Sequence, residues 1–451
     1  MSAVLINLLS FMVAISVLVA VHEFGHYLVG RLCGMKVLRF SIGFGKPIWT
    51  WIGGRDRTEY CVSAIPLGGY VKFLDEREGP VQPADQGRAF NHRPVPARIA
   101  VLLAGPVFNF LFAVLAYWVL FINGVPTVRP AVGEVTPGSY ADVAGLEYGD
   151  RIIAVGEREA SDWETALVAM LGEMVDNGKV TLELEGEDGW QRSAVLDVGN
   201  DRARLTVPGV LFEGLGFVPW QPPAVVGRVE EQGAASAAGI LEGDRITGIA
   251  GNPIVNFSDL QDVVAARPGE AVSVRLIRDG EERLLDLRLG SREVDGEVVG
   301  FMGVGIAPTA GDHWYVRKFG PVSAIGESVE RTWNSTGFTV RMLARMVTGD
   351  VSIKNISGPI NIAQYAGDSA AAGLNAFLSF LALVSISLGV LNLLPVPILD
   401  GGQIVYQAVE LIKGSPLSDR SQLVGQQVGI LALLLLMSFA FYNDIARILN
   451  Q

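Results

Sequence analysis

The sequence predicts a polytopic α-helical membrane protein with four transmembrane helices, a membrane-associated β-hairpin region, and two tandem β-rich modules outside the membrane. Half of the 451 residues are hydrophobic, only 18% are charged, and the mean hydropathy is +0.36. This composition is more apolar than that of ordinary soluble domains and fits several membrane spans joined to a soluble part. A nine-residue motif that occurs twice in the middle of the chain then indicates the repeated modules.

Four apolar stretches are long enough to cross a bilayer as helices, roughly 4–30, 98–122, 375–398 and 424–442. No Lys or Arg precedes Arg31, so the first stretch lacks the positive start of a cleaved signal peptide and is predicted to remain as a span. The predicted segments are span 1 (1–31), a β region (32–97), span 2 (98–123), two modules (124–217 and 218–309), a membrane-surface region (310–373), span 3 (374–399), a loop (400–423) and span 4 (424–444).

The distribution of charge predicts the orientation of the spans. Residues 31–98 hold 11 Lys and Arg against 6 Asp and Glu, whereas residues 99–399 hold 21 against 36. Because short basic loops stay in the cytoplasm, this loop is expected inside, with the acidic middle and both termini outside. The net charge of −12 argues against nucleic-acid binding. Cys33 and Cys61 fall on the predicted cytoplasmic side, where a structural disulfide is not expected.

The segment that follows the first span has the pattern of short β-strands. It contains FSIGFGKPIWTWIGG and EYCVSAIPLGGYVKF, in which β-branched and aromatic residues alternate around Gly68 and Gly69. The segment is apolar for a loop, so two interpretations stay open. It either dips into the membrane, where its strand edges must be covered by protein or by a polar cavity, or it lies at the interface.

The middle of the chain repeats itself. Residues 144–152 read AGLEYGDRI and residues 238–246 read AGILEGDRI, and each is followed by a glycine-rich run: Gly214-Leu215-Gly216-Phe217, then Gly303-Val304-Gly305-Ile306. The AGxxxGDRI motif resembles PDZ domains, and GLGF resembles their carboxylate-binding loop. Its place at the end of each module resembles the circularly permuted bacterial form. Such a loop lets backbone N–H groups converge on an anion beside a strand that pairs with a peptide. Two PDZ folds with occluded grooves are the alternative.

Residues 310–373 are expected to lie along the outer membrane surface. Trp333, Phe338, Val340, Leu343 and Met346 are consistent with an amphipathic helix, and Gly358-Pro359 interrupts the pattern after it. This region would join the two modules to the spans.

The first span carries His22-Glu23-Phe24-Gly25-His26, which is an HExxH motif. Two His residues four positions apart share one helix face and can bind one Zn²⁺, with Glu23 placed to take a proton from an activated water. Ionisable groups inside a membrane span indicate function by default. The motif therefore predicts hydrolysis of peptide bonds within or beside the bilayer.

A catalytic zinc usually has three protein ligands, and HExxH supplies two. His92 and His313 are expected in solvated segments. Asp400 follows Asn392-Leu393-Leu394-Pro395-Val396-Pro397 at the end of the third apolar stretch and is the favoured third ligand. The alternative role for Asp400 is the N-cap of a cytoplasmic helix that starts near Gly401.

These motifs together resemble the site-2 protease family of intramembrane zinc metalloproteases. The resemblance covers the whole chain: HEFGH, NLLPVPILDGG, SIGFG, IPLGGYVKF, AGPVFN, the four spans and the tandem PDZ modules. It implies that His22, His26 and Asp400 hold one catalytic Zn²⁺, with Glu23 as the general acid and base. Asn392 would orient the substrate or stabilise the oxyanion, whereas Asn109 is interpreted as a helix-packing residue. Gly68, Gly69 and Tyr70 would present an edge strand to an unwound substrate.

The resemblance also implies the setting: a bacterial inner membrane, with the PDZ modules and both termini in the periplasm. Implied substrates are single-pass membrane proteins that an upstream site-1-type protease has trimmed, such as an anti-sigma factor in an envelope stress response, and signal-peptide remnants. The PDZ pair would bind the new C-terminus or exclude untrimmed substrates by size.

Three other classes of function compete with this interpretation. The first is a non-catalytic membrane scaffold that recruits partners through its PDZ modules; the intact Glu23 argues against it. A PDZ-bearing serine protease would need a His base outside HExxH, and a transporter would not need a Glu between two paired His residues.

Overall fold

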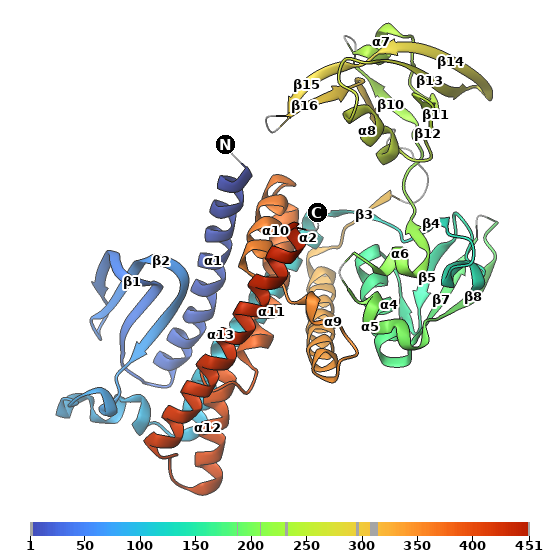
Figure 1. Ribbon diagram of the computed structural model, residues 1–451. Coiled ribbons are helices and arrows are strands. Elements are labelled where there is room, and N and C mark those ends of the chain that lie inside the picture. Colours follow the sequence, from blue (N-terminus) through green and yellow to red (C-terminus); the bar gives the residue numbers. More distant parts are fainter. Residues whose placement is uncertain are drawn as a thin grey trace. The chain divides into compact units, whose positions relative to one another are not determined.

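The computed structural model describes residues 3–186, 188–207, 209–230, 233–294, 297–306 and 314–449. The chain forms two compact units. We call Met1–Val125, Lys318–Thr348 and Ile353–Gln451 the span unit, and Pro126–Arg317 with Gly349–Ser352 the repeat unit. Figure 1 draws the elements of both.

In the described part of the chain, four helices are long and apolar enough to cross a membrane. They are α1 (Ala3–Leu32), α2 (Val95–Asn123), α11 (Leu374–Asn392) and α13 (Asp419–Leu449). Helix α2 packs against both α1 and α11, and Leu18 of α1 is buried with Leu381 of α11. The start of α1 and the end of α13 lie at the same end of this bundle (Figure 1). The protein is therefore a multi-pass membrane protein.

The third span departs from the prediction of 374–399, because its helix ends at Asn392. Pro395 and Pro397 follow, and since proline has no N–H and disfavours a helical residue before it, the chain forms turns up to Leu399. A further helix, α12 (Asp400–Lys413), then occupies most of the segment predicted as a loop.

The predicted strands between the first two spans are β1 (Val37–Gly53) and β2 (Thr58–Phe73), which pair antiparallel. Both are bent, so they form four segments. Phe40 pairs with Val71 on one side and Tyr60 on the other, and Trp51 also pairs with Tyr60. The register gives the order 47–53, 58–63, 37–42, 69–73, in which 69–73 is an edge segment. Positive φ angles at Gly43 and Gly45 accompany the bend in β1.

The region 310–373 contains two helices, α9 (Pro321–Thr348) and α10 (Pro359–Ala371), while residues 310–313 lie outside the described residues. Helix α9 packs against α2, and α10 against α1. The N-terminus of α10 is held by the buried carboxylate of Asp444 in α13, which accepts backbone N–H groups from Gly358, Ile360 and Asn361 at 2.9–3.1 Å. The location of the region 310–373 at a membrane surface stays a prediction.

The two modules of the repeat unit begin with the same order of elements and differ before the last strand, where the first has two short helices and the second has two further strands. The first comprises β4 (Val132–Val135), α3 (Tyr140–Val143), β5 (Arg151–Val155), β6 (Arg158–Glu159), α4 (Trp163–Asn177), β7 (Lys179–Glu185), β8 (Gln191–Asp197), α5 (Arg202–Leu205), α6 (Leu211–Leu215) and β9 (Phe217–Pro219). The second comprises β10 (Val226–Val229), α7 (Ala234–Ala237), β11 (Arg245–Ile249), β12 (Asn252–Pro253), α8 (Phe257–Ala265), β13 (Ala271–Arg278), β14 (Glu281–Arg288), β15 (Gly290–Val294), β16 (Glu297–Phe301) and β17 (Val304–Ile306). Short strands β3 (Val125–Val128) and β18 (Trp314–Arg317) flank them.

The strand order is the same in both modules. The sheets run β6-β5-β7-β8 and β12-β11-β13-β14, and in each module the first strand pairs with the last, β4 with β9 and β10 with β17. Each module has its own apolar core, centred on residues such as Ile152 and Leu184 in the first and Ile246 and Leu276 in the second.

The repeated AGxxxGDRI motif encodes a turn that a buried ion pair closes. Asp244 accepts the Leu241 N–H at 2.8 Å and two hydrogen bonds from Arg278 at 2.7 Å, and Arg278 also binds the Gly239 carbonyl. Burial raises the pKa of Asp244, but the hydrogen bonds from Arg278 and Leu241 outweigh it and hold that pKa below its usual value.

Asp150 and Arg192 make the same contacts in the first module, with the Glu147 N–H and the Gly145 carbonyl. The glycine after the alanine of the motif has a positive φ in both copies, at Gly145 and Gly239, which explains why the position is glycine.

Candidate metal centre

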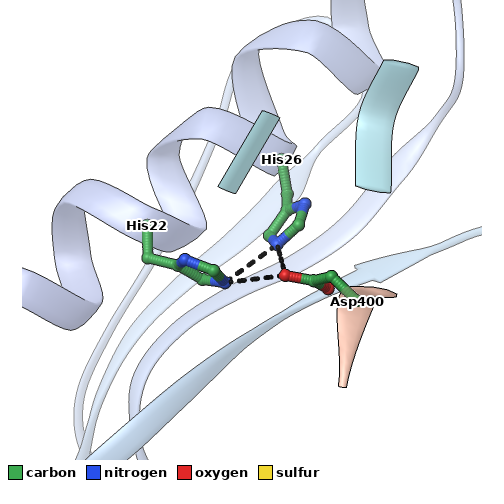
Figure 2. A group of neighbouring side chains, drawn as sticks. All are labelled: His22, His26 and Asp400. Atoms are coloured by element: carbon green, nitrogen blue, oxygen red, sulfur yellow. Dashed lines mark hydrogen bonds and ion pairs between the residues drawn. The ribbon is translucent and has the colours of Figure 1, made fainter. Parts of the chain in front are cut away.

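The two histidines of HExxH lie one turn apart on α1, and Asp400, the first residue of α12, reaches them from the other side (Figure 2). The Nε2 atoms of His22 and His26 are 3.1 Å apart. The Oδ2 atom of Asp400 lies 3.2 Å from His22 Nε2 and 3.5 Å from His26 Nε2. Among the described residues, this is the one group of three or more His, Cys, Asp or Glu side chains close enough to hold a metal ion.

The spacing of the three atoms fits zinc. Ligands about 2.0–2.1 Å from a tetrahedral Zn²⁺ are about 3.3 Å from one another, and the three distances above bracket that value. Two imidazoles and a carboxylate also leave one position for a water, as in catalytic zinc sites. Apart from its contacts with the two imidazoles, the buried Oδ2 of Asp400 has no hydrogen-bond partner, as expected of an atom that binds a metal.

Both imidazoles are oriented through their other nitrogen. His26 Nδ1 donates to the Val101 carbonyl of α2 at 2.7 Å, and His22 Nδ1 is 3.2 Å from the Asn109 side-chain amide, also on α2. Metal-binding histidines characteristically have such a second partner, which fixes the tautomer and directs the free nitrogen to the metal. The Asn109 side-chain amide can also be placed with its oxygen and nitrogen exchanged by a 180° rotation. In that orientation Oδ1, which is otherwise buried without a partner, accepts a hydrogen bond from His22 Nδ1.

Asn109 therefore does more than the helix packing expected from the sequence. Its backbone carbonyl does join helices, since it accepts the Ser385 hydroxyl of α11 at 2.8 Å. Its side chain, fully buried, lies against the ring of His22. The packing interpretation is correct for the backbone and incomplete for the side chain.

Glu23 lies beside these ligands in a cavity of about 500 Å³. Asn392, Gly69 and Tyr70 line the same cavity, whereas Gly68 is at the bend before them, close to the Phe44 ring. A Cβ on Gly69 would be 3.0 Å from the Glu23 side chain, so the edge segment 69–73 runs directly past the acid.

Gly105 of α2 is a site residue that the sequence reasoning missed. A Cβ at this position would collide with the imidazoles of His22 and His26, so only glycine lets α2 approach the ligands this closely. The one signal in the sequence is the AGPVFN run, which carries the residue without indicating its role.

The N-cap interpretation of Asp400 is wrong. Helix α12 begins at Asp400 itself with Leu399 at the N-cap, and no side chain caps it. The two glycines that follow are needed because a Cβ on Gly401 or Gly402 would collide with the carbonyls of the turn after Asn392. The carboxylate is thereby free to face the histidines.

The other two histidines do not join the cluster. His92 interacts with the Gln86 carbonyl and with Glu76. These residues belong to a segment formed by the short helices η1 (Glu76–Glu78), η2 (Pro83–Arg88) and η3 (Phe90–His92). His313 lies outside the described residues.

The two glycine-rich loops of the repeat unit differ. In the first module, the N–H groups of Gly214 and Gly216 donate to the carbonyls of Val210 and Phe212, while Leu215 and Phe217 are buried in the core. In the second module, a cavity of about 160 Å³ lies beside Gly303 and Val304, with Leu260 of α8 in its lining. Gly305 pairs with Arg228 of β10, and the side chain of Ile306 lies outside the described part. Carboxylate binding by either loop stays a prediction.

A bundle of membrane spans that buries an HExxH motif against a distant aspartate defines a membrane-embedded metallopeptidase. The model of peptidase family M50 matches residues 10–436. This chain belongs to that family.

Two relatives match over almost the whole chain. The regulator of sigma E protease of Salmonella typhi is 40% identical over 99% of this chain and 100% of its own length. The regulator of sigma-E protease RseP of Escherichia coli strain K12 is 40% identical over 98% and 99%. A solved structure, the PDZ domain of an SdrC-like protein from Listeria monocytogenes, is 20% identical over 19% of this chain and 87% of that one, with a TM-score of 0.17. That TM-score is too low to support an argument.

These matches confirm the resemblance to the site-2 protease family and the expectation of a zinc metallopeptidase. Other relatives are named zinc metalloproteases, so the expectation of one catalytic zinc is confirmed at the level of the family.

Proposed function

We propose that this protein is an intramembrane zinc endopeptidase that cleaves the transmembrane segment of single-pass membrane proteins already trimmed on the outer side. The observation that carries the proposal is the cluster of His22, His26 and Asp400, with Glu23 beside it, among helices that can span a membrane. The names of the two relatives point to regulation of a sigma factor. An anti-sigma factor in an envelope stress response is therefore the favoured substrate, with signal-peptide remnants as a second class.

His22, His26 and Asp400 would hold the zinc, and zinc bound there would supply Lewis-acid activation of the attacking water and the scissile carbonyl. Glu23 takes the proton that the water loses and returns it to the leaving amine. Asn392 lines the cavity that contains Glu23. Its side-chain N–H would donate a hydrogen bond to the developing oxyanion or to the substrate backbone. Val101 and Asn109 keep the two imidazoles in the tautomer that leaves Nε2 unprotonated.

The substrate enters as an added strand. A helical substrate hides its carbonyls in its own hydrogen bonds, so it must be held extended before attack. The segment 69–73 is an edge of the β1–β2 sheet and passes Glu23, which supports the role proposed for Gly68, Gly69 and Tyr70. Tyr70 itself is anchored by a 3.0 Å hydrogen bond from Arg39 to its hydroxyl.

The setting is the bacterial inner membrane, with the basic segment 31–98 in the cytoplasm and the repeat unit and both termini in the periplasm. The charge asymmetry of the sequence supports this orientation. An upstream protease of the site-1 type would trim the substrate first.

The two modules of the repeat unit are proposed to be tandem, circularly permuted PDZ domains. Their common strand order and the pairing of first with last strand support this assignment. Of the two roles considered for them, exclusion of untrimmed substrates is favoured over binding of a C-terminus. Two loop amides of the first module already have intramolecular partners, and the groove of the second is small.

The test is reconstitution of the full-length protein in lipid vesicles with a trimmed single-pass substrate. Wild type is expected to cleave within the transmembrane segment, and Glu23→Gln to lose on the order of 10²–10⁴-fold in rate while still binding zinc. Asp400→Ala should lose cleavage and bind zinc much more weakly, through the two histidines alone. Cleavage that persists in Asp400→Ala would remove this residue from the ligand set, and cleavage that persists in Glu23→Gln would refute the mechanism.

A further inference from the structure

Helix α2 contributes none of the proposed ligands, yet one of its faces holds the partners of the site. Arg98, Val101, Gly105 and Asn109 follow one another at spacings of three and four, so they share a face. Val101 binds His26, Asn109 lies against His22, and Gly105 packs between the two rings. Arg98, at the start of this row, faces α12, the helix that begins with the third ligand.

Arg98 makes a two-pronged ion pair with Glu410. Its two terminal nitrogens donate to the two carboxylate oxygens at 3.0 and 2.6 Å, and its Nε donates to the Arg93 carbonyl at 3.0 Å. Arg98 is only 8% exposed. Two parallel charge-assisted bonds fix direction as well as distance, which a single bond would not. The pair therefore sets the orientation of α12 relative to α2.

Glu410 lies in the C-terminal half of α12, where the helix has few other described contacts. Helix α12 packs mainly against α2, and the Tyr406 hydroxyl of α12 lies close to Gly425 of α13, while Val405, Leu411 and Ile412 are exposed. At its other end, Gly401 and Gly402 permit close contact with the turn after Asn392, and the Gln403 side chain donates to the Pro397 carbonyl of that turn at 2.8 Å. Since Asp400 is the first residue of α12 and Glu410 lies ten residues further on, a pivot of the helix would displace the carboxylate from the histidines.

We infer that Arg98, acting through Glu410, is a positioning residue for Asp400: the ion pair holds α12 in the direction that brings the carboxylate to His22 and His26. The inference rests on the proposed metal centre and adds two residues that neither the motifs nor the cavity around the ligands indicate. Helix α2 then positions all three ligands, two through direct hydrogen bonds and one through the α12 helix.

The test measures zinc affinity of the full-length protein in detergent, by competition with a chromophoric chelator. Glu410→Ala is expected to raise the zinc dissociation constant about 10–100-fold, as loss of ligand-orienting partners does. The exchanged pair, Arg98→Glu with Glu410→Arg, should recover most of the loss. Asp56→Asn is the control, because it removes the charge from another ion pair in the segment before α2, in which Asp56 lies 2.8 Å from the partly exposed Arg88. It should leave zinc affinity unchanged.

A double-mutant cycle separates positioning from general damage. In an Asp400→Ala background, Glu410→Ala should no longer change the residual zinc affinity, because the residue through which it acts is gone. An equal loss in that background, or a wild-type affinity in Glu410→Ala alone, would overturn the inference. Neither result bears on cleavage by the wild-type protein, so failure here is distinct from failure of the proposed function.

Discussion

At the scale of single residues, the site depends on groups that never touch the metal. His22 and His26 each use one nitrogen for the proposed zinc and the other for a contact to α2. One of these contacts is a backbone carbonyl, which mutation cannot remove. The other is the side chain of Asn109, which makes it the accessible test of ligand orientation.

Asn109→Leu should weaken zinc binding about 10–100-fold, because His22 Nδ1 loses the buried side chain that orients the ring. Asn109→Asp keeps an acceptor and should bind zinc within a few-fold of wild type. Ser385→Ala is the control, since it removes only the hydroxyl bound to the Asn109 carbonyl. Equal zinc affinity in Asn109→Leu and wild type, by the same chelator competition, would show that His22 needs no such partner.

Some site residues are indicated by the sequence and others are not. The two groups differ in the sequence separation between each residue and the residues that it contacts. His22, Glu23 and His26 form one helical turn, so their spacing alone indicates a shared site. Asp400 was found because a catalytic zinc needs a third ligand. Gly105 and Asn109 act across more than 75 positions of sequence, and no local pattern indicates such pairs; their motif signalled importance without a role. The pair Arg98–Glu410 has no motif at all.

At the scale of elements, α2 is the helix against which α1, α9, α11 and α12 pack. Pro106 lies within it, beside Gly105, and the helix continues unbroken to Asn123. Small side chains on its face toward α1 let the histidine-bearing helix approach closely. The sequence predicts a span at this position but does not indicate that it holds the other helices. An apolar run indicates the length and burial of a helix, not which helices pack against it.

Gly105→Ala tests this close approach. The added methyl group has no room beside the two imidazoles, so we expect loss of on the order of 1–3 kcal/mol in stability together with weaker zinc binding. Gly326→Ala in α9 is the matched control, because nothing lies within 4 Å of the added Cβ. It should be neutral or stabilising by up to about 1 kcal/mol. Thermal unfolding and zinc titration of both variants measure the contrast, and a tolerant Gly105→Ala would contradict the packing described.

Two elements differ from what the sequence predicts, both for reasons of backbone chemistry. The third span stops at Asn392 because prolines follow, and apolar side chains alone had suggested continuation to 399. The expected hairpin is a sheet of four segments, since glycines bend strands that the alternation pattern shows as continuous. In both elements local composition indicates the type of structure, whereas prolines and glycines determine where it ends or bends.

At the scale of the whole molecule, the proposed role of the repeat unit is to decide which substrates reach the site. Gly303→Val tests its second loop. Gly303 has a positive φ, and an added Cβ would lie 2.9 Å from the Gly233 backbone, so the variant distorts the proposed carboxylate loop. Under size exclusion, cleavage of a trimmed substrate should stay within about twofold of wild type, whether its C-terminus is a free carboxylate or an amide.

The competing role predicts a different result. If the loop binds the new C-terminus, Gly303→Val should raise KM for the free carboxylate and leave the amide unchanged. Initial rates over a range of substrate concentrations distinguish the two outcomes, with the amidated substrate as the internal control.

The most direct test of the central claim, a metal site divided between α1 and α12, is X-ray absorption at the zinc edge of the zinc-loaded full-length protein. Wild type should show two imidazole ligands and oxygen ligands at about 2.0–2.2 Å, with no sulfur. Asp400→Ala should retain both imidazoles and lose one oxygen ligand of the protein. A third imidazole, a thiolate, or a spectrum unchanged by Asp400→Ala would contradict the account.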